Sequence, residues 1–310
     1  MANANFDSLL STTLANYRSQ LTDNVFTARP LTYTLMDKGR IRMLNGGTKI
    51  VEPLIYGNNS TVASYSGYDS LALTPQEGIS AAEYDWKQYA ASIAISGIEE
   101  AKNNGEQEII NLLEAKIMQA EESMRESFNQ MFFADGTGNG GKDWNGLGNL
   151  VESGNTVGGI DSNTWSYWRS KEENTATALT LAQMSSMYNS VSVGNDHPDT
   201  LLTTQALFEK YEALLQPNLR YTDTKTADAG FQNLLFKAAP VMYDVHCTAG
   251  VFYFLNTKYI TLVGHSNKWF AQTDFIKPED TDARYALIMC YGNLTVRNRA
   301  KQGKLTAKTA

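Results

Sequence analysis

The sequence predicts an α+β fold, and three features carry that prediction. One is a helical period that persists across residues 97–134, and another is the alternation of apolar and polar side chains that ends at Ser96. The third is a carboxyl-terminal third built from short β-type segments. The order of ribbon, long helix, mixed middle and long final strand is typical of α+β proteins. The 310 residues suffice for one large domain or two ordinary ones.

Residues 1–45 are predicted to form an arm outside the core. They hold a weak helical pattern between Phe6 and Leu21, then the helix breaker Pro30 and a short apolar group at residues 31–36. A segment so sparse in apolar side chains has to dock on something else to become ordered. Its start has neither the basic nor the apolar region of a secretory signal, so an intracellular, soluble protein is expected.

Residues 46–96 are expected to form a two-stranded ribbon around a long polar tip. The strands cover residues 48–56 and 84–96, and the end of the second strand places four apolar side chains on one face: Tyr89, Ala91, Ile93 and Ile95. A two-stranded ribbon is marginally stable alone in water, and no second layer is encoded nearby. We therefore expect the ribbon to lie on another subunit. Three of its tyrosines are candidates for that contact: Tyr56, Tyr65 and Tyr68.

Residues 97–134 give the clearest secondary-structure signal. Ten residues step by three or four with a mean of 3.67, which is a helical period: Ile98, Ala101, Gly105, Ile109, Leu113, Ile117, Ala120, Met124, Phe128 and Met131. The continuous part from Glu106 to Phe133 would be about 42 Å long. Asp135-Gly136 supplies the stop. One apolar stripe on so long a helix suits a spine laid across a sheet.

The remaining segments alternate between short helices and short strands. Residues 136–175 are interpreted as a glycine-rich connection, followed by helices over 179–193 and 205–215 and a strand over 200–204. Further strands are predicted at Leu235–Phe236, Pro240–Asp244, Val251–Leu255, Thr261–Val263 and Tyr285–Arg297.

The net charge of −7 is spread unevenly. The last 19 residues carry five basic side chains and no acidic one: Arg297, Arg299, Lys301, Lys304 and Lys308. The first 45 residues are slightly basic, so the body between them is acidic. This distribution argues against a dedicated nucleic-acid binder, which would show a basic stripe across its folded face. The basic end is interpreted as a solvated tail, or alternatively as a segment that binds an acidic neighbour.

A glycine cluster resembles two phosphate-binding motifs. Residues 136–143 nearly match a Walker A loop, and Gly136, Gly138 and Gly141 have the spacing of the dinucleotide fingerprint. Both motifs require a strand before the loop and a helix after it. Here a helix precedes the loop, and Asp143 takes the place of the Mg²⁺-binding Ser or Thr. A flexible hairpin is therefore the preferred interpretation.

Composition also gives little support for metal or acid–base chemistry. The three histidines and two cysteines are scattered apart from His246-Cys247, whose side chains would point to opposite faces of a strand. Two cysteines form no disulfide framework. No Gly-x-Ser-x-Gly elbow is present. The sequence therefore predicts no catalytic residue, no cofactor and no metal, and no apolar segment is long enough to span a membrane.

One loop between strands combines both signs of charge. Its charged residues are Lys277, Glu279, Asp280, Asp282 and Arg284. It is either an ordinary surface turn or a subunit contact whose charges set pairing specificity.

The ordered set of segments from about Asn45 to Thr306 resembles the major capsid proteins of tailed bacteriophages with the Hong Kong 97 fold. The resemblance rests on Trp86-Lys-Gln-Tyr89 to Ile95 with the long helix, and on Phe133-Ala-Asp-Gly-Thr-Gly with Gly146-Leu-Gly-Asn-Leu-Val. It continues through Pro198-Asp-Thr-Leu-Leu-Thr-Thr, Ala239-Pro-Val-Met-Tyr-Asp, Val251-Phe-Tyr-Phe-Leu-Asn and the closing strand Ala286 to Arg297.

This resemblance implies a division of the chain. Residues 1–45 would be the N-terminal arm and 46–96 the extended loop (E-loop) that reaches over a neighbouring subunit. Residues 97–199 and 271–310 would form the peripheral domain around the spine helix, and 200–270 the axial domain. The mixed-charge loop at 277–284 would lie near three-fold axes.

The resemblance also implies a function and partners. The chain would be a structural, non-enzymatic coat protein that assembles as pentamers and hexamers into an icosahedral head around double-stranded DNA, in the cytoplasm of a host bacterium. Only about 45 residues precede the ribbon, so a scaffolding protein is expected to be separate. A portal and a decoration protein are further expected partners, and a membrane is not. The alternatives are an encapsulin-type bacterial compartment and a nucleotide-binding enzyme that uses the Gly136–Lys142 loop.

Overall fold

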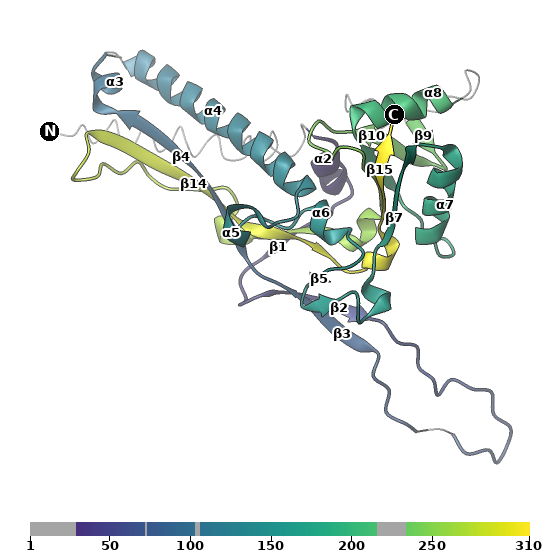
Figure 1. The fold of residues 1–310 in the computed structure, drawn as a ribbon. Helices are drawn as coiled ribbons and strands as arrows, with labels where there is room; N and C mark the ends of the chain where they lie inside the picture. The colour runs from purple at the N-terminus through teal and green to yellow at the C-terminus, as the bar shows by residue number, and fades with distance from the viewer. Residues whose placement is uncertain (1–28, 72, 103–105, 216–233) are drawn as a thin grey trace.

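The structure is a computed structural model that describes residues 29–71, 73–102, 106–215 and 234–310. The helical pattern predicted between Phe6 and Leu21 lies outside these residues. The described chain forms two larger β-sheets. The main hydrophobic core includes residues of both sheets, such as Leu262 of the first and Leu202 of the second, and a smaller core belongs to the second sheet and its helices. A β-ribbon with a long loop projects away from both sheets (Figure 1). The predicted α+β class is confirmed.

The first sheet has five strands and is organised around one long strand near the end of the chain. Its order is β1 (Ile41–Leu44), β12 (Ile260–His265), β14 (Ala283–Val296) and β13 (Ala271–Gln272), with β4 (Lys87–Ser96) also paired to β14. The associated helices and turns are α2 (Pro30–Asp37), α3 (Gly97–Lys102), α4 (Glu106–Phe133), α5 (Gly138–Gly141), α6 (Leu147–Leu150), η2 (Thr257–Tyr259), η3 (Ser266–Lys268) and η4 (Arg299–Lys301).

The second sheet has six strands and carries two helices. Its order is β7 (Lys171–Ala178), β15 (Gly303–Thr309), β11 (Phe252–Leu255), β8 (Thr200–Thr203), β10 (Ala239–Tyr243) and β9 (Leu234–Phe236). The helices are α7 (Leu181–Val191) and α8 (Gln205–Leu214). Two small hairpins complete the fold, formed by β2 (Ile50–Ile55) with β3 (Ile79–Tyr84) and by β5 (Thr156–Val157) with β6 (Ile160–Asp161), followed by η1 (Ser166–Trp168).

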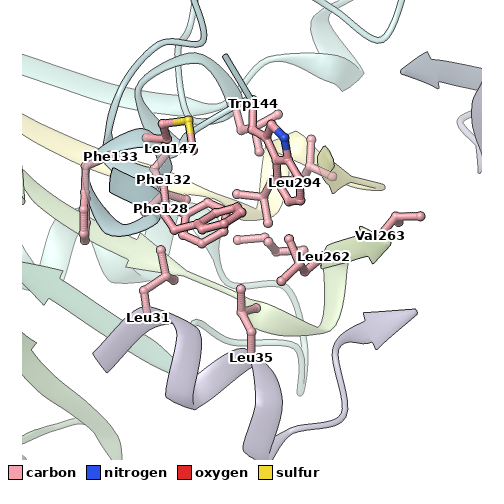
Figure 2. Packing of buried hydrophobic residues seen from close by; sticks show 14 of the residues in the cluster. Leu31, Leu35, Phe128, Phe132, Phe133, Trp144, Leu147, Leu262, Val263 and Leu294 are labelled. Carbon is pink, nitrogen blue, oxygen red and sulfur yellow. The ribbon is translucent and has the colours of Figure 1, made fainter. Parts of the chain in front are cut away.

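The predicted spine helix is confirmed, with α4 running from Glu106 to Phe133 along β4 and β14 (Figure 1). Its apolar stripe packs into an aromatic cluster in the main core. The Phe128 ring lies 4.7 Å from that of Tyr89 on β4 and 5.0 Å from that of Trp144. Figure 2 shows this cluster closed from the other side by Leu31 and Leu35 of α2.

The prediction of one continuous second ribbon strand is wrong, because the strand is interrupted between Tyr84 and Lys87. The ribbon consists of β2 and β3, whereas β4 pairs antiparallel with β14 from Lys87 opposite Gly292 to Ser96 opposite Ala283. The alternation predicted at the end of β4 is real, and its apolar face is covered by the chain's own helix α4 rather than by another subunit. A local pattern fixes the face of a strand without fixing its partner.

The prediction that residues 1–45 lie outside the core is wrong for their described part. Leu31 and Leu35 on α2 are completely buried in the main core. β1 then adds a parallel strand to β12. The apolar residues are few, but Leu31 and Leu35 are four apart and therefore lie on one face of a short helix.

The basic end is also corrected, because it is neither a solvated tail nor a free binding segment. β15 lies inside the six-stranded sheet, parallel to β7 and antiparallel to β11. Lys304 and Lys308 are buried there, and their ammonium groups pair with Glu152 at 2.5 Å and with Glu173 at 3.1 Å. The partner strand β7 lies at the end of the region predicted as a glycine-rich connection. The sequence did not predict this strand, because Lys171–Ala178 has no alternation of apolar and polar side chains.

Candidate assembly surfaces

The base of the ribbon is attached to its own chain by one face. Along β2 the buried residues Ile50, Glu52 and Leu54 alternate with exposed ones, and on β3 Ala82 and Tyr84 are buried. This corrects the expectation that the whole ribbon lacks a second layer. Only the opposite face and the loop beyond it are free to meet another subunit.

A buried carboxylate anchors this base. Glu52 is completely buried, and its carboxylate accepts hydrogen bonds from Arg297 Nε at 2.6 Å, from Arg42 and from Thr295 Oγ1 at 3.3 Å. Nearby, the Tyr84 hydroxyl donates to the Val296 carbonyl at 2.8 Å, and burial raises the pKa of this phenol. These bonds join the ribbon to β1 and to the end of β14, so its direction of projection is fixed.

Beyond the base, the loop of residues 57–78 projects into solvent (Figure 1). The hydrogen bonds described for its side chains stay within the loop, as between Ser60 Oγ and Gln76 Oε1 at 2.9 Å. Two of the predicted contact residues, Tyr65 and Tyr68, are exposed here. The loop also exposes Val62, Leu71 and Leu73, which the polar composition of the tip had obscured.

The third predicted tyrosine has a different environment. Tyr56 stacks on Tyr167 with ring centroids 4.6 Å apart and planes inclined by 11°, and the ring of Trp165 lies 6.2 Å away. These aromatic rings border a cavity of about 590 Å³ beside the exposed face of β3. Tyr56 therefore supports the root of the loop through contacts within the chain.

The mixed-charge loop lies at the far end of the β4–β14 pair. The Lys277 ammonium is 2.8 Å from Asp282 Oδ1 and holds the pKa of Asp282 below its ordinary value. The Gly97 amide donates to the Asp282 carbonyl at 2.7 Å, so this residue closes the loop against α3. Glu279 and Asp280 are exposed, and Arg284 is half-buried opposite Ile95.

The two groups of predicted contact residues are therefore not brought together. The tyrosines lie on or near the projecting ribbon, and the charged loop lies near α3 at the opposite end of the molecule (Figure 1). Two exposed isoleucines accompany the charged loop and were not predicted: Ile98 on α3 and Ile276 beside the loop. Each exposed end thus combines apolar and polar side chains.

The glycine cluster lacks the strand before it that a phosphate loop requires, but it forms the short helical turn α5 rather than the predicted hairpin. Helix α4 precedes it, and Asn139 and Gly140 adopt left-handed backbone angles within α5. The Gly141 carbonyl accepts a hydrogen bond from the Lys87 ammonium, which ties the loop to β4.

Two further classes of site find no support in the described part of the chain. No group of three His, Cys, Asp or Glu side chains there could hold a metal ion. Among the described helices, none is both long and apolar enough to cross a membrane. Burial raises the thiol pKa of Cys247 and of Cys290, which keeps both thiols protonated and unreactive at neutral pH.

Comparison with solved structures identifies the architecture. No protein-family model and no curated protein matches the chain. The capsid of cyanophage A-1(L) superposes with a TM-score of 0.62 at 16% identity, covering 87% of this chain and 91% of that one. The capsid of the native GTA particle gives 0.58 at 12% identity, with 88% and 89% covered.

An encapsulin structure superposes on this chain about as well as the capsid structures do. The holo-SrpI encapsulin complex of Synechococcus elongatus PCC 7942 gives a TM-score of 0.57 at 9% identity, with 88% of this chain and 87% of that one covered. In each of these comparisons the superposition covers at least 87% of both chains. This protein has the Hong Kong 97 fold, the architecture of phage capsids.

Proposed function

We propose that this chain is the major capsid protein of a tailed bacteriophage, and that it assembles into the icosahedral head around double-stranded DNA. Its role would be structural rather than enzymatic, and its place the virion after assembly in the bacterial cytoplasm. The fold supports this proposal, as does the extensive similarity to capsid structures. Its partners would be other copies of the chain in pentamers and hexamers, a separate scaffolding protein, a portal and a decoration protein.

The observation that carries the proposal is the contrast between the base and the loop of the ribbon. The base is fixed by the buried Glu52, whereas the loop exposes Val62, Tyr65, Tyr68 and Leu73. Large apolar side chains gathered on a projecting segment are typical of an interaction surface. A loop held in one direction by its own subunit is suited to reach a neighbouring copy, and many such weak contacts close a shell.

The two cores support a division into domains close to that predicted. We propose that the six-stranded sheet, with α7 and α8, is the axial domain, and that the five-stranded sheet with α4 is the peripheral domain. The second core includes Met184 of α7 and Leu305 of β15, which favours moving both elements from the peripheral to the axial domain. Conversely, Leu262 of β12 belongs to the main core and favours the peripheral domain.

The second candidate function is that of an encapsulin-type compartment, a shell that encloses protein instead of DNA, because the encapsulin structure matches about as well as the capsid structures. The fold does not separate them, but what the shell encloses does. Particles purified from the native host should contain nuclease-protected double-stranded DNA if the chain is a capsid protein. A packaged protein without DNA would support the encapsulin alternative.

The projecting loop offers a direct test, because its two ends meet. The Tyr56 amide donates to the Gly78 carbonyl at 2.9 Å, so residues 57–77 can be replaced by Asn-Gly, a two-residue hairpin turn. We expect this variant to keep the melting temperature of the unchanged chain and to lose assembly in sedimentation and electron microscopy. Full assembly of a folded variant would contradict the assigned role of the loop. As a matched control, Lys142→Gln at the end of the glycine-rich turn α5 should assemble normally.

A further inference from the structure

A cavity of about 840 Å³ lies where α2 meets the six-stranded sheet. Its walls come from α2 and Arg40 on one side and from the β9–β10 turn, residues 195–199 and the start of η2 on the other. Four basic side chains line it: Lys38, Arg40, Lys237 and Lys258. Both larger sheets therefore contribute cations to one concave space.

All three acids in the same walls have interaction partners. The Asp199 carboxylate lies 3.0 Å from the Lys38 ammonium and accepts a hydrogen bond from the Thr257 hydroxyl at 2.6 Å. Asp196 accepts hydrogen bonds from the Tyr259 hydroxyl at 2.5 Å and from Asn256 Nδ2 at 2.8 Å. Against the opposing effect of burial, these bonds hold the pKa of Asp196 below its ordinary value. Asp37 is the third acid, at the exposed rim.

Two of the cations, Lys237 and Arg40, have no carboxylate within ion-pair distance among the described residues, whereas the charge of Lys258 acts on Asp196. The Lys237 ammonium is held by two neutral groups, Ser185 Oγ at 2.8 Å and Asn189 Oδ1 at 2.9 Å. The Lys258 ammonium lies 5.4 Å from the ring centre of Tyr259. Arg40 Nε is buried and has no hydrogen-bond partner. The cavity therefore keeps an excess of positive charge and an unused guanidinium donor.

An aromatic surface lies beside these cations. The rings of Tyr188 and His197 are stacked, with centroids 5.9 Å apart and planes inclined by 17°. Tyr188 is buried, whereas His197 is exposed and lines the cavity. A flat ring beside guanidinium and ammonium groups matches the two parts of a nucleotide, because bases stack on rings and phosphates bind the cations.

We propose that this cavity binds the phosphate groups of a nucleotide, with Arg40, Lys237 and Lys258 as the phosphate ligands and His197 as the stacking surface for the base. A bound phosphate would neutralise cations from both sides of the cavity and so connect α2 to the six-stranded sheet. The nucleotide could be free or part of a nucleic acid, since both present the same phosphate chemistry. The inference does not rest on shell assembly.

Calorimetric titration of the full chain with ADP at low salt tests the proposal. The double variant Lys237→Gln/Lys258→Gln changes two exposed side chains, so it should fold as the unchanged chain does. We expect its Kd for ADP to rise at least about tenfold, since hydrogen bonds to ionised groups are among the strong ones. Arg40→Gln should have a similar effect, and Lys142→Gln at the end of the glycine-rich turn α5 should have none.

Competition identifies the source of the phosphate. Displacement of ADP by a single-stranded oligonucleotide would indicate that the natural ligand is a nucleic acid. If the oligonucleotide does not displace ADP, the natural ligand is a free nucleotide. Either result supports the site, provided that the double variant weakens binding. The proposal is overturned if ADP does not bind, if the double variant binds it unchanged, or if Lys142→Gln abolishes binding. An oligoglutamate peptide that binds more tightly than ADP would also overturn it, because the cavity would then recognise an acidic peptide.

Discussion

The carboxylate of Glu52 accepts a hydrogen bond of 2.6 Å from Arg297 Nε, and this contact joins the root of the ribbon to the end of the longest strand. Glu52 is completely buried, whereas the Arg297 side chain is 41% exposed. The acid is therefore the member of the pair that has no access to water, and it depends on its two arginines for compensation.

Replacing Glu52 by Ala should destabilise the fold. The change would leave Arg42 and Arg297 without their shared carboxylate, and because both arginines are partly exposed, the cost is that of lost hydrogen bonds to charged groups, about 1–3 kcal/mol. Chemical denaturation should therefore show a free energy of unfolding lower by about 1–3 kcal/mol. As a control, Glu83→Ala removes a half-exposed partner of Lys49 and should cost less than about 1 kcal/mol. Equal effects of the two changes would contradict the assigned role of Glu52.

Lys304 should behave as a structural residue. Its ammonium lies 2.5 Å from Glu152 and 3.5 Å from Glu172, and its side chain is 7% exposed. Lys304→Ala should lower the free energy of unfolding by about 3 kcal/mol, because two carboxylates lose their cation. Lys171→Ala, at an exposed position on the neighbouring strand β7, should leave stability unchanged. If Lys304 belonged to a solvated basic tail instead, both variants would leave the free energy of unfolding almost unchanged.

Gly292 should tolerate no side chain. A Cβ atom there would lie 2.3 Å from the Val263 carbonyl oxygen and 2.8 Å from the Trp144 ring, so the sheet backbone or a packed aromatic group would have to move. Overpacking of this kind typically costs about 1–3 kcal/mol, and Gly292→Ala should lower the melting temperature accordingly. Gly154→Ala is the matched control, because its nearest contact would be Asn163 Oδ1 at 3.6 Å. The prediction fails if both variants melt together.

Glu99 gives a prediction for acid conditions. Hydrogen bonds from Lys116 and from the Ser96 backbone lower the pKa of Glu99 to about 2. Because the folded-state pKa is depressed, its contribution to stability is complete above about pH 4.3, the ordinary value for Glu, and is lost as the pH falls toward 2.

Comparison of the unchanged chain with Glu99→Gln tests this point. The variant should be less stable at pH 7 and equally stable near pH 2, as measured by denaturant unfolding at each pH. Glu77→Gln, at an exposed position on the projecting loop, serves as the control and should show no such dependence. A difference for Glu99→Gln that stays constant down to pH 2 would contradict the depressed pKa.

The parts of the fold that the sequence predicted well are those encoded by local periodicity. The stripe from Ile117 to Met131 identified α4, and alternation identified the inward face of β4. The pairing of β4 was not predictable in this way, because Ser96 faces Ala283, far along the chain. Lys304 was interpreted as solvated for the same reason, since Glu152 and Glu172 are distant in sequence.

The candidate assembly surfaces were predicted only in part. Tyr65 and Tyr68 are exposed on the loop as expected, but Tyr56 packs within the chain. Leu71 and Leu73 were missed because a polar composition suggested a solvated tip, although two leucines within three residues were the available signal. Glu52 was missed because an acid in a predicted strand carries no sign of being buried. Whether any of these residues contacts a neighbouring copy remains a prediction.

Electron microscopy of the purified full chain, alone and with a scaffolding protein from the same genome, tests whether the chain forms a shell. We predict closed shells tens of nanometres across, and we predict that replacing residues 57–77 by Asn-Gly abolishes them while the protein stays folded. Only monomers under both conditions and over a range of salt concentrations would contradict it.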